Sequence, residues 1–113
     1  MPSDLTVIRP GHHLVRTVHE DPLAQFLSGQ LTERTKKAYY SDLCEFFNGD
    51  RIRPEDVQAV DFADIIEYRN ALAAMGRKRT TINRKLSSLK AFFKMMIAAD
   101  IIDKNPADSA LVR

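Results

Sequence analysis

Positively charged side chains concentrate in one stretch of the chain, GRKRTTINRKLSSLKAFFKMMIAA, which covers positions 76–99. This stretch holds seven lysines and arginines and no acidic residue, whereas the rest of the chain holds ten basic and fifteen acidic residues. Small and hydroxyl residues lie among the charges and would let a helix approach another surface closely. Lysine and arginine are the side chains that proteins use to bind phosphate and carboxylate groups. The composition therefore indicates a surface that binds an anion.

The same stretch has the apolar spacing of a buried helix. Residues three and four positions apart lie on one face of a helix. The apolar residues that follow this spacing are Ile82, Leu86, Leu89, Phe93, Met96 and Ile97. The residues that project to the opposite side are Thr80, Arg84, Ser87, Ser88 and Ala91. We therefore expect a helix whose apolar face is buried and whose basic face stays in solvent.

Three interpretations of the basic face are open. A helix face rich in lysine and arginine is most often simply solvated. Here, however, the like charges have no acidic neighbour within the helix, so they repel one another unless an anion is bound. Arg77, Lys78 and Arg79 directly precede the helix, where its free N–H groups also favour an anion. We therefore favour nucleic acid as the partner, and a helical protein-interaction domain that binds an acidic partner is the alternative.

A second basic cluster lies in the sequence ERTKKAYYSD. Arg34, Lys37 and Ser41 share the outward face of the helix expected there, and Lys36 and Tyr40 flank that face. Together with the first stretch, this helix could form a second wall of one positive surface. Residues 54–68 contain five acidic residues and no basic residue, so we expect them to face away from nucleic acid.

Local signals predict the helices that position these residues. Asp21-Pro22 is a typical N-cap and first helical residue, and Gly29 ends the short helix that follows. A second helix is expected from Thr32 to about Phe47, where the sequence NGD stops it. The connector after it contains one helical turn following Pro54.

The third helix has the strongest start signal. Asp61 is a good N-cap with Asp64 three residues later, and Gly76 suits the end of the helix. The fourth helix runs from Thr80 to about Ala99. The residues expected on the buried faces of the first three helices are Leu23, Phe26, Leu27, Tyr39, Leu43, Phe46, Phe47, Ile65, Tyr68, Leu72 and Met75. No segment has the pattern of a strand, so the sequence predicts a compact all-α domain of about four helices.

Composition narrows the class of protein further. The 113 residues, 44% of them hydrophobic and 28% charged, suit one globular domain. A single cysteine, Cys44, excludes an internal disulfide, and its spacing from His12, His13 and His19 matches no metal site. We therefore expect no metal and no cofactor. We expect no secretory leader, and no apolar run is long enough for a membrane, which favours a reducing cytoplasm.

The order of these motifs resembles the N-terminal core-binding domain of tyrosine recombinases, the phage-integrase family of site-specific DNA recombinases. The matching segments are LTERTKKAYYSDLCEFF, FADIIEYRNAL and RTTINRKLSSLKAFFKMMIAADIIDKNPA, and the resemblance covers roughly residues 22–110. The family commonly has glycine just after the fourth helix, where this chain has Asp100. Aspartate tolerates a left-handed backbone better than most residues, so the turn is still expected.

The resemblance implies a SAM-like orthogonal four-helix bundle that packs on one side of duplex DNA. A catalytic domain of the same parent chain would close on the other side, and neighbouring recombinase protomers would bind the same DNA. By position, the resemblance implies DNA contacts from Lys36, Lys37, Ser41, Thr80, Thr81, Arg84, Lys85 and Ser88. With the charges noted above, the candidate DNA-binding residues are Arg34, Lys36, Lys37, Ser41, Arg77, Lys78, Arg79, Thr80, Thr81, Arg84, Lys85 and Ser88.

Residues 1–20 lack clear periodicity and are expected to form an irregular arm, which has no counterpart in the family. The resemblance implies that residues 21–107 form the core-binding domain and that residues 108–113 begin a linker to an absent catalytic domain. The tyrosine nucleophile of the family belongs to that catalytic domain. Tyr39 and Tyr68 lie on expected core faces and Tyr40 flanks the expected DNA face, so we expect no catalysis by this chain. The parent protein would act in the cytoplasm of a bacterium or an archaeon, or be encoded by a phage.

Overall fold

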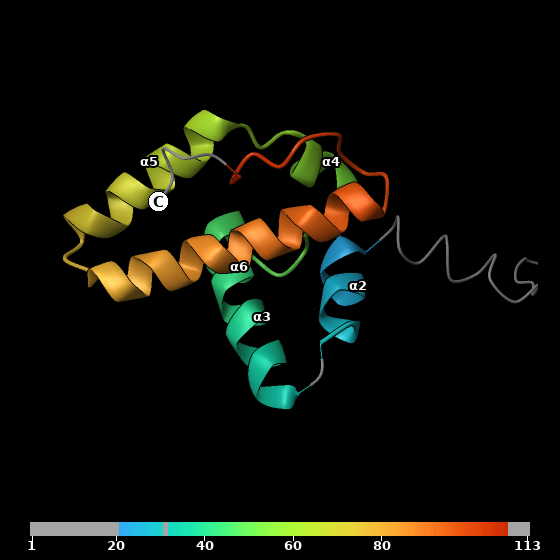
Figure 1. Ribbon diagram of the computed structural model, residues 1–113, viewed down its shortest axis with the longest axis horizontal. Helices are drawn as coiled ribbons and strands as arrows, with labels where there is room; N and C mark the ends of the chain where they lie inside the picture. The colour runs from blue at the N-terminus through green and yellow to red at the C-terminus, as the bar shows by residue number, and fades with distance from the viewer. Residues whose placement is uncertain (1–20, 31, 109–113) are drawn as a thin grey trace, which may run out of the picture.

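The computed structural model describes residues 21–30 and 32–108, which form five helices and no strand. The four longer helices are α2 (Pro22–Ser28), α3 (Glu33–Phe47), α5 (Phe62–Ala74) and α6 (Arg79–Ala98). The short α4 (Pro54–Gln58) is the helical turn expected after Pro54. In Figure 1, α5 lies along one side of α6, while α2 and α3 run across it on the other side. The predicted all-α orthogonal bundle of four helices is confirmed. The expected arm, residues 1–20, lies outside the described residues.

The helices begin where the capping signals predict. Asp21 and Thr32 each accept a hydrogen bond from a backbone N–H of the first turn, at 3.1 Å, at the starts of α2 and α3. At the start of α5, Asp61 and Asp64 cap each other, because each carboxylate accepts the backbone N–H of the other at 3.0 Å. Of the four longer helices in the described residues, α6 is the one whose start has no side chain that accepts a backbone hydrogen bond. Lys78 occupies its N-cap position.

Three helices end on a residue with a left-handed backbone. These residues are Asn48 after α3, Gly76 after α5 and Asp100 after α6, with φ angles of 62°, 81° and 66°. In each case the next N–H donates back to a carbonyl in the last helical turn, for example from Ile101 to Met96 at 2.9 Å. The expected turn at Asp100 is therefore confirmed, as are the ends of α3 and α5.

The core is built around α6. Its buried apolar residues are Leu86, Leu89, Phe92, Phe93 and Met96. The ring of Phe92 packs edge-to-face on Phe26 from α2 and on Phe47 from α3, with centroids 5.4 and 5.8 Å apart. Because α2 and α3 cover one side of α6 and α5 covers another, α6 is buried over a wider arc than a single apolar stripe.

Two residues expected in the core are exposed. Met75 is 65% exposed because α5 has already ended at Ala74, so Met75 lies in the turn rather than on the buried face. Ile97 is 37% exposed because the buried arc of α6 is centred nearer Phe92, which leaves Ile97 at its edge. Both predictions of burial were wrong.

The segment after α6 folds back on the bundle (Figure 1). Gln58 of α4 donates to the carbonyl of Ile101 at 3.1 Å, and Asn105 donates to the carbonyl of Lys90 in α6 at 3.0 Å. Ala107 is fully buried in the hydrophobic core. Residues 101–107 are thus packed as part of the domain.

The two glycines at helix ends give opposite predictions. Gly76→Ala is expected to lower the free energy of unfolding by about 1 kcal/mol, because an L-residue is strained at a φ of 81°. Gly29→Ala is expected to be neutral or to raise it by up to about 1 kcal/mol. Gly29 has a negative φ, and its added Cβ would meet neighbours at 3.6 Å or more. Urea denaturation of both variants measures the contrast, and equal effects would contradict it.

Candidate nucleic-acid interface

A buried carboxylate joins α3 to α6. Asp42, in the middle of α3, is only 2% exposed. Its Oδ2 atom accepts hydrogen bonds from Arg84 Nη1 and Ser88 Oγ, both at 2.6 Å, and its Oδ1 atom accepts from Lys85 Nζ at 3.3 Å. All three donors come from the N-terminal half of α6. Asp42 therefore fixes the position of α3 against the part of α6 where the basic residues gather.

Glu45 extends these contacts by one turn of α3. Its Oε1 atom accepts from Lys85 Nζ at 2.8 Å and from the Tyr68 hydroxyl at 2.7 Å, and its Oε2 atom accepts from Arg77 Nη2 at 3.1 Å. These contacts connect α3 to α5 and to the turn before α6. We call the whole set the interhelical network: Asp42, Glu45, Tyr68, Arg77, Arg84, Lys85 and Ser88.

The network changes the acidity of two of its members. Partial burial alone would raise the pKa of the Glu45 carboxyl, but the hydrogen bonds from Lys85, Tyr68 and Arg77 outweigh it and hold that pKa at about 2. Burial and the hydrogen bond to Glu45 raise the pKa of the Tyr68 hydroxyl. Glu45 is therefore ionised, and Tyr68 protonated, throughout the neutral range.

Two of the candidate DNA-binding residues are buried in this network. Lys85 and Ser88 are 6% and 4% exposed. The expectation that Ser88 projects outward was wrong, because α3 packs over that side of α6 and supplies Asp42 as its partner. Both side chains therefore lie beneath the surface of the domain.

The charges of the basic stretch also have more partners than the sequence indicates. Arg77, Arg84 and Lys85 pair with the carboxylates of α3, and Lys90 lies 3.7 Å from Asp108. Within the described residues, the members of the stretch that pair with no carboxylate are Lys78, Arg79 and Lys94. Repulsion among seven unpaired charges is therefore no argument for a bound anion, because four of the seven are paired.

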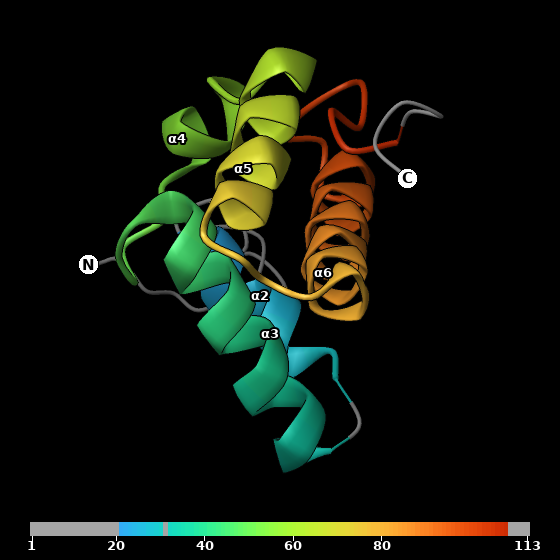
Figure 2. The ribbon, with the colours of Figure 1, turned by 90° about the vertical axis from the view of Figure 1, so that its left-hand side faces the viewer.

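Most of the remaining candidates are exposed, on α3 and at the N-terminal end of α6. In Figure 2, α3 and the N-terminal end of α6 are both turned toward the reader. Exposed candidates on α3 are Arg34, Lys37 and Ser41, while Lys36 pairs with Glu33 at 3.2 Å. Exposed candidates at the start of α6 are Lys78, Arg79 and Thr80, with Thr81 partly buried. We call Arg34, Lys37, Ser41, Lys78, Arg79, Thr80 and Arg84 the basic surface.

Arg84 belongs both to the network and to the basic surface. One of its guanidinium nitrogens contacts the buried Asp42, yet its side chain is 53% exposed. A hollow of about 410 Å³ opens between α5 and the start of α6. The hollow is lined by Arg69, Asn70, Ala73, Arg77, Arg79, Ile82 and Asn83, and no carboxylate is among them. The positive surface therefore continues from α6 toward the end of α5.

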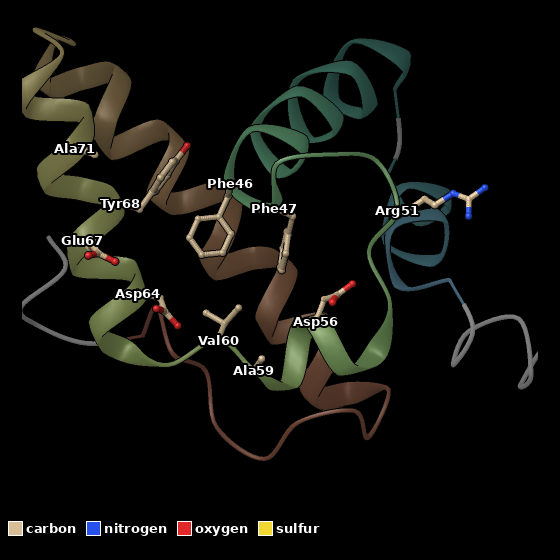
Figure 3. Close-up of a pocket in the computed structure, with 10 residues that line it drawn as sticks. All are labelled: Phe46, Phe47, Arg51, Asp56, Ala59, Val60, Asp64, Glu67, Tyr68 and Ala71. Carbon is tan, nitrogen blue, oxygen red and sulfur yellow. The ribbon is translucent and has the colours of Figure 1, made fainter.

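A second hollow, of about 500 Å³, has the opposite character (Figure 3). Aromatic rings of Phe46 and Phe47 border it, together with Tyr68. Its carboxylates are Asp56, Asp64 and Glu67, and the guanidinium of Arg51 points away from it in Figure 3. We call it the acidic groove. It lies at the C-terminal end of α3 and along α5, whereas Arg34 and Lys37 lie at the N-terminal end of α3.

Other candidate chemistry is limited. Burial raises the pKa of the Cys44 thiol, which disfavours the reactive thiolate. Among the described residues, no group of histidines, cysteines and carboxylates could hold a metal ion. The histidines at positions 12, 13 and 19 lie outside the described part of the chain. No helix within residues 21–30 and 32–108 is long and apolar enough to cross a membrane.

Comparison with known proteins identifies the fold. Residues 23–100 match the family described as the phage integrase, N-terminal SAM-like domain. The chain belongs to this family. The predicted resemblance and the predicted SAM-like all-α fold are thereby confirmed. No solved structure matches the chain.

Relatives of this SAM-like domain are longer proteins. It is 36% identical over 76 residues to the tyrosine recombinase XerC of Thermodesulfovibrio yellowstonii, which covers 67% of this chain and 24% of the relative. It is 35% identical over 79 residues to the tyrosine recombinase XerC of Pediococcus pentosaceus, a match that covers 68% of this chain and 26% of the relative. It is 36% identical over 90 residues to the tyrosine recombinase XerC of Listeria monocytogenes, a match that covers 73% of this chain and 29% of the relative. The chain thus spans about a quarter of the length of these relatives.

The pKa of Glu45 predicts a pH-dependent contribution to stability. Its pKa of about 2 lies below its ordinary 4.5, so the ionised form is favoured in the folded state. The contribution is complete above about pH 5 and is lost as the pH falls toward 2. Glu45→Gln should lower the free energy of unfolding by about 1–2 kcal/mol at pH 7 and by almost nothing at pH 2. The figure at pH 7 is reduced because solvent screens the partly exposed carboxylate.

Urea denaturation between pH 2 and pH 7 measures this difference. Glu67→Gln is the matched control. Glu67 is exposed on α5, and its side chain makes no hydrogen bond in the part of the chain that the structure describes. It should change stability by less than about 0.5 kcal/mol at any of these pH values. A Glu45→Gln effect that is the same at pH 2 and pH 7 would contradict the assignment.

Proposed function

We propose that this SAM-like domain is the DNA-binding module of a site-specific tyrosine recombinase. It holds duplex DNA on one side, while a catalytic domain of the same parent protein closes on the other. The observation that carries this proposal is the basic surface, whose exposed cations come from two crossing helices. The names of the relatives, tyrosine recombinases, support the same function.

The contacts proposed for DNA follow from exposure and pairing. Lys37 and Arg34 on α3, and Lys78 and Arg79 at the start of α6, are exposed and have no carboxylate partner in the described part of the chain. They can each neutralise a phosphate without first breaking an ion pair. Ser41, Thr80 and Thr81 add hydroxyl donors, while Lys85 and Ser88 support the surface from within.

Catalysis is assigned to another part of the parent protein. The family matched is an N-terminal domain, and residues 21–107 are proposed as its limits here. The hydroxyl group of Tyr68 donates a hydrogen bond to Glu45 and its pKa is raised, which does not suit a nucleophile. The proposed partners are duplex DNA, the catalytic domain and neighbouring protomers on the same DNA. The proposed location is the cytoplasm of a bacterium or archaeon, or of the host of a phage.

The proposal predicts salt-dependent DNA binding through exposed cations. The affinity of the chain for duplex DNA should fall with salt with a log–log slope of about −4, for four or five phosphate contacts. Lys37→Gln and Arg79→Gln should each weaken binding about three- to tenfold at low salt and make the slope shallower by about one. Fluorescence anisotropy with a labelled duplex at several salt concentrations measures both quantities.

Arg51→Gln is the matched control, because it removes the same charge beside the acidic groove. It should change the affinity by less than about twofold. If Arg51→Gln weakens binding as much as Lys37→Gln, the basic surface is not the site. If the affinity does not depend on salt, or if poly-glutamate binds as tightly as DNA, the alternative of an acidic protein partner is favoured instead.

A further inference from the structure

Asp42 places a negative charge under a surface proposed to bind DNA. It lies directly after the exposed Ser41 on α3, yet almost none of it is accessible to solvent. A carboxylate is costly to bury unless cations and hydroxyl groups satisfy it. Here both oxygens are satisfied, and every donor comes from α6. The position of this charge therefore calls for an explanation beyond the packing of two helices.

The carboxylate of Asp42 is itself held in place. Ser88 Oγ donates to Oδ2 and Lys85 Nζ donates to Oδ1, so rotation of the carboxylate would break at least one of these contacts. Lys85 is in turn held by Glu45, whose Oε1 atom lies 2.8 Å from Nζ. The orientation of the Asp42 carboxylate is thus held by Ser88 and Lys85 as well as by Arg84.

Arg84 is the one exposed donor to this fixed carboxylate. Its Nη1 atom lies 2.6 Å from Asp42 Oδ2, while about half of the side chain faces solvent. A guanidinium is planar and carries five N–H donors, so a hydrogen bond from Nη1 limits the directions in which the remaining donors can point. An arginine that is already ordered in the free protein loses less side-chain entropy when it binds a phosphate or a base edge.

We infer that Asp42 is a positioning residue, whose buried carboxylate holds the guanidinium of Arg84 in the orientation that contacts duplex DNA. This inference rests on the proposed function, because DNA affinity is its readout. Arg84 touches the DNA, and Asp42 acts only through Arg84. Lys85 balances the buried charge and makes no contact with DNA.

The sign of one substitution separates this role from simple electrostatics. Asp42→Asn removes a negative charge close to the bound polyanion, so charge alone would strengthen binding. A positioning role has the opposite consequence, because Arg84 loses its ionic partner and becomes free to rotate. We expect Asp42→Asn to weaken DNA binding about five- to tenfold.

A double-mutant cycle tests whether Asp42 acts through Arg84. The four proteins are the wild type, Asp42→Asn, Arg84→Gln and the double variant, each titrated with the same duplex at one salt concentration. Asp42→Asn should weaken binding in the Arg84 background and change it by less than about twofold in the Arg84→Gln background. Equal losses in the two backgrounds would assign Asp42 a structural role only, and tighter binding by Asp42→Asn would also overturn the inference.

Two further variants keep the test informative if Asp42→Asn folds poorly. Ser88→Ala removes one hydrogen bond to Asp42 and keeps every charge, and it should weaken binding about two- to threefold only while Arg84 is present. Ile65→Val reduces the packing of the core on α5 and removes none of the hydrogen bonds or ion pairs of the network. It should leave DNA affinity unchanged within about twofold, although it lowers stability. A loss of affinity with Ile65→Val as large as that with Ser88→Ala would attribute both to stability.

The outcomes distinguish this inference from the proposed function. If Arg84→Gln leaves the affinity unchanged while Lys37→Gln and Arg79→Gln weaken it, the positioning role is wrong and the DNA-binding function stands. If none of the three changes the affinity, the proposed function fails, and the inference fails with it.

Discussion

Burial of the Asp42 carboxylate is the constraint on which the arrangement of α3 and α6 depends. An ionised group that is removed from water needs its partners in fixed positions, and breaking such a group from its partners typically costs about 3–5 kcal/mol. Sliding α3 along α6 would separate Asp42 from Arg84, Lys85 and Ser88. Apolar contacts between the same helices are less directional, since leucine and phenylalanine side chains can repack. The carboxylate therefore adds geometric specificity to a contact that the aromatic core stabilises.

The same constraint explains how α6 can be both the centre of the core and part of a basic surface. Its apolar residues face α2, α3 and α5, and Lys85 and Ser88 extend the buried arc by meeting carboxylates of α3. Lys78 and Arg79 are exposed at its N-terminal end, where free backbone N–H groups add positive potential. Arg84, Lys90 and Lys94 are exposed further along the helix. Asp56 of α4 and Asp64 and Glu67 of α5 line the acidic groove. Opposite potentials thus occupy different parts of one small domain.

Local chemistry made most of the fold predictable from the sequence. Asp61 with Asp64 and Asn48 with Gly49 set helix ends through contacts a few residues apart, so a short stretch contains all the information needed. The network was not predictable in this way. A helical projection assigns a polar residue such as Asp42 to solvent, and its partners lie more than 40 positions away. Counting charges within 76–99 failed for the same reason, because the neutralising acids lie outside that stretch, at Asp42 and Glu45 on α3 and at Asp108 after α6.

The packed exit of the chain has a mechanical consequence. Residues 101–107 are tied to α4 through Gln58 and to α6 through Asn105, and Ala107 is buried. A polypeptide joined after this segment would be anchored to the domain at Ala107. A force applied there would act first on the hydrogen bond between Asn105 and α6 rather than on a flexible linker. The force would therefore be transmitted directly to the helix at the centre of the core.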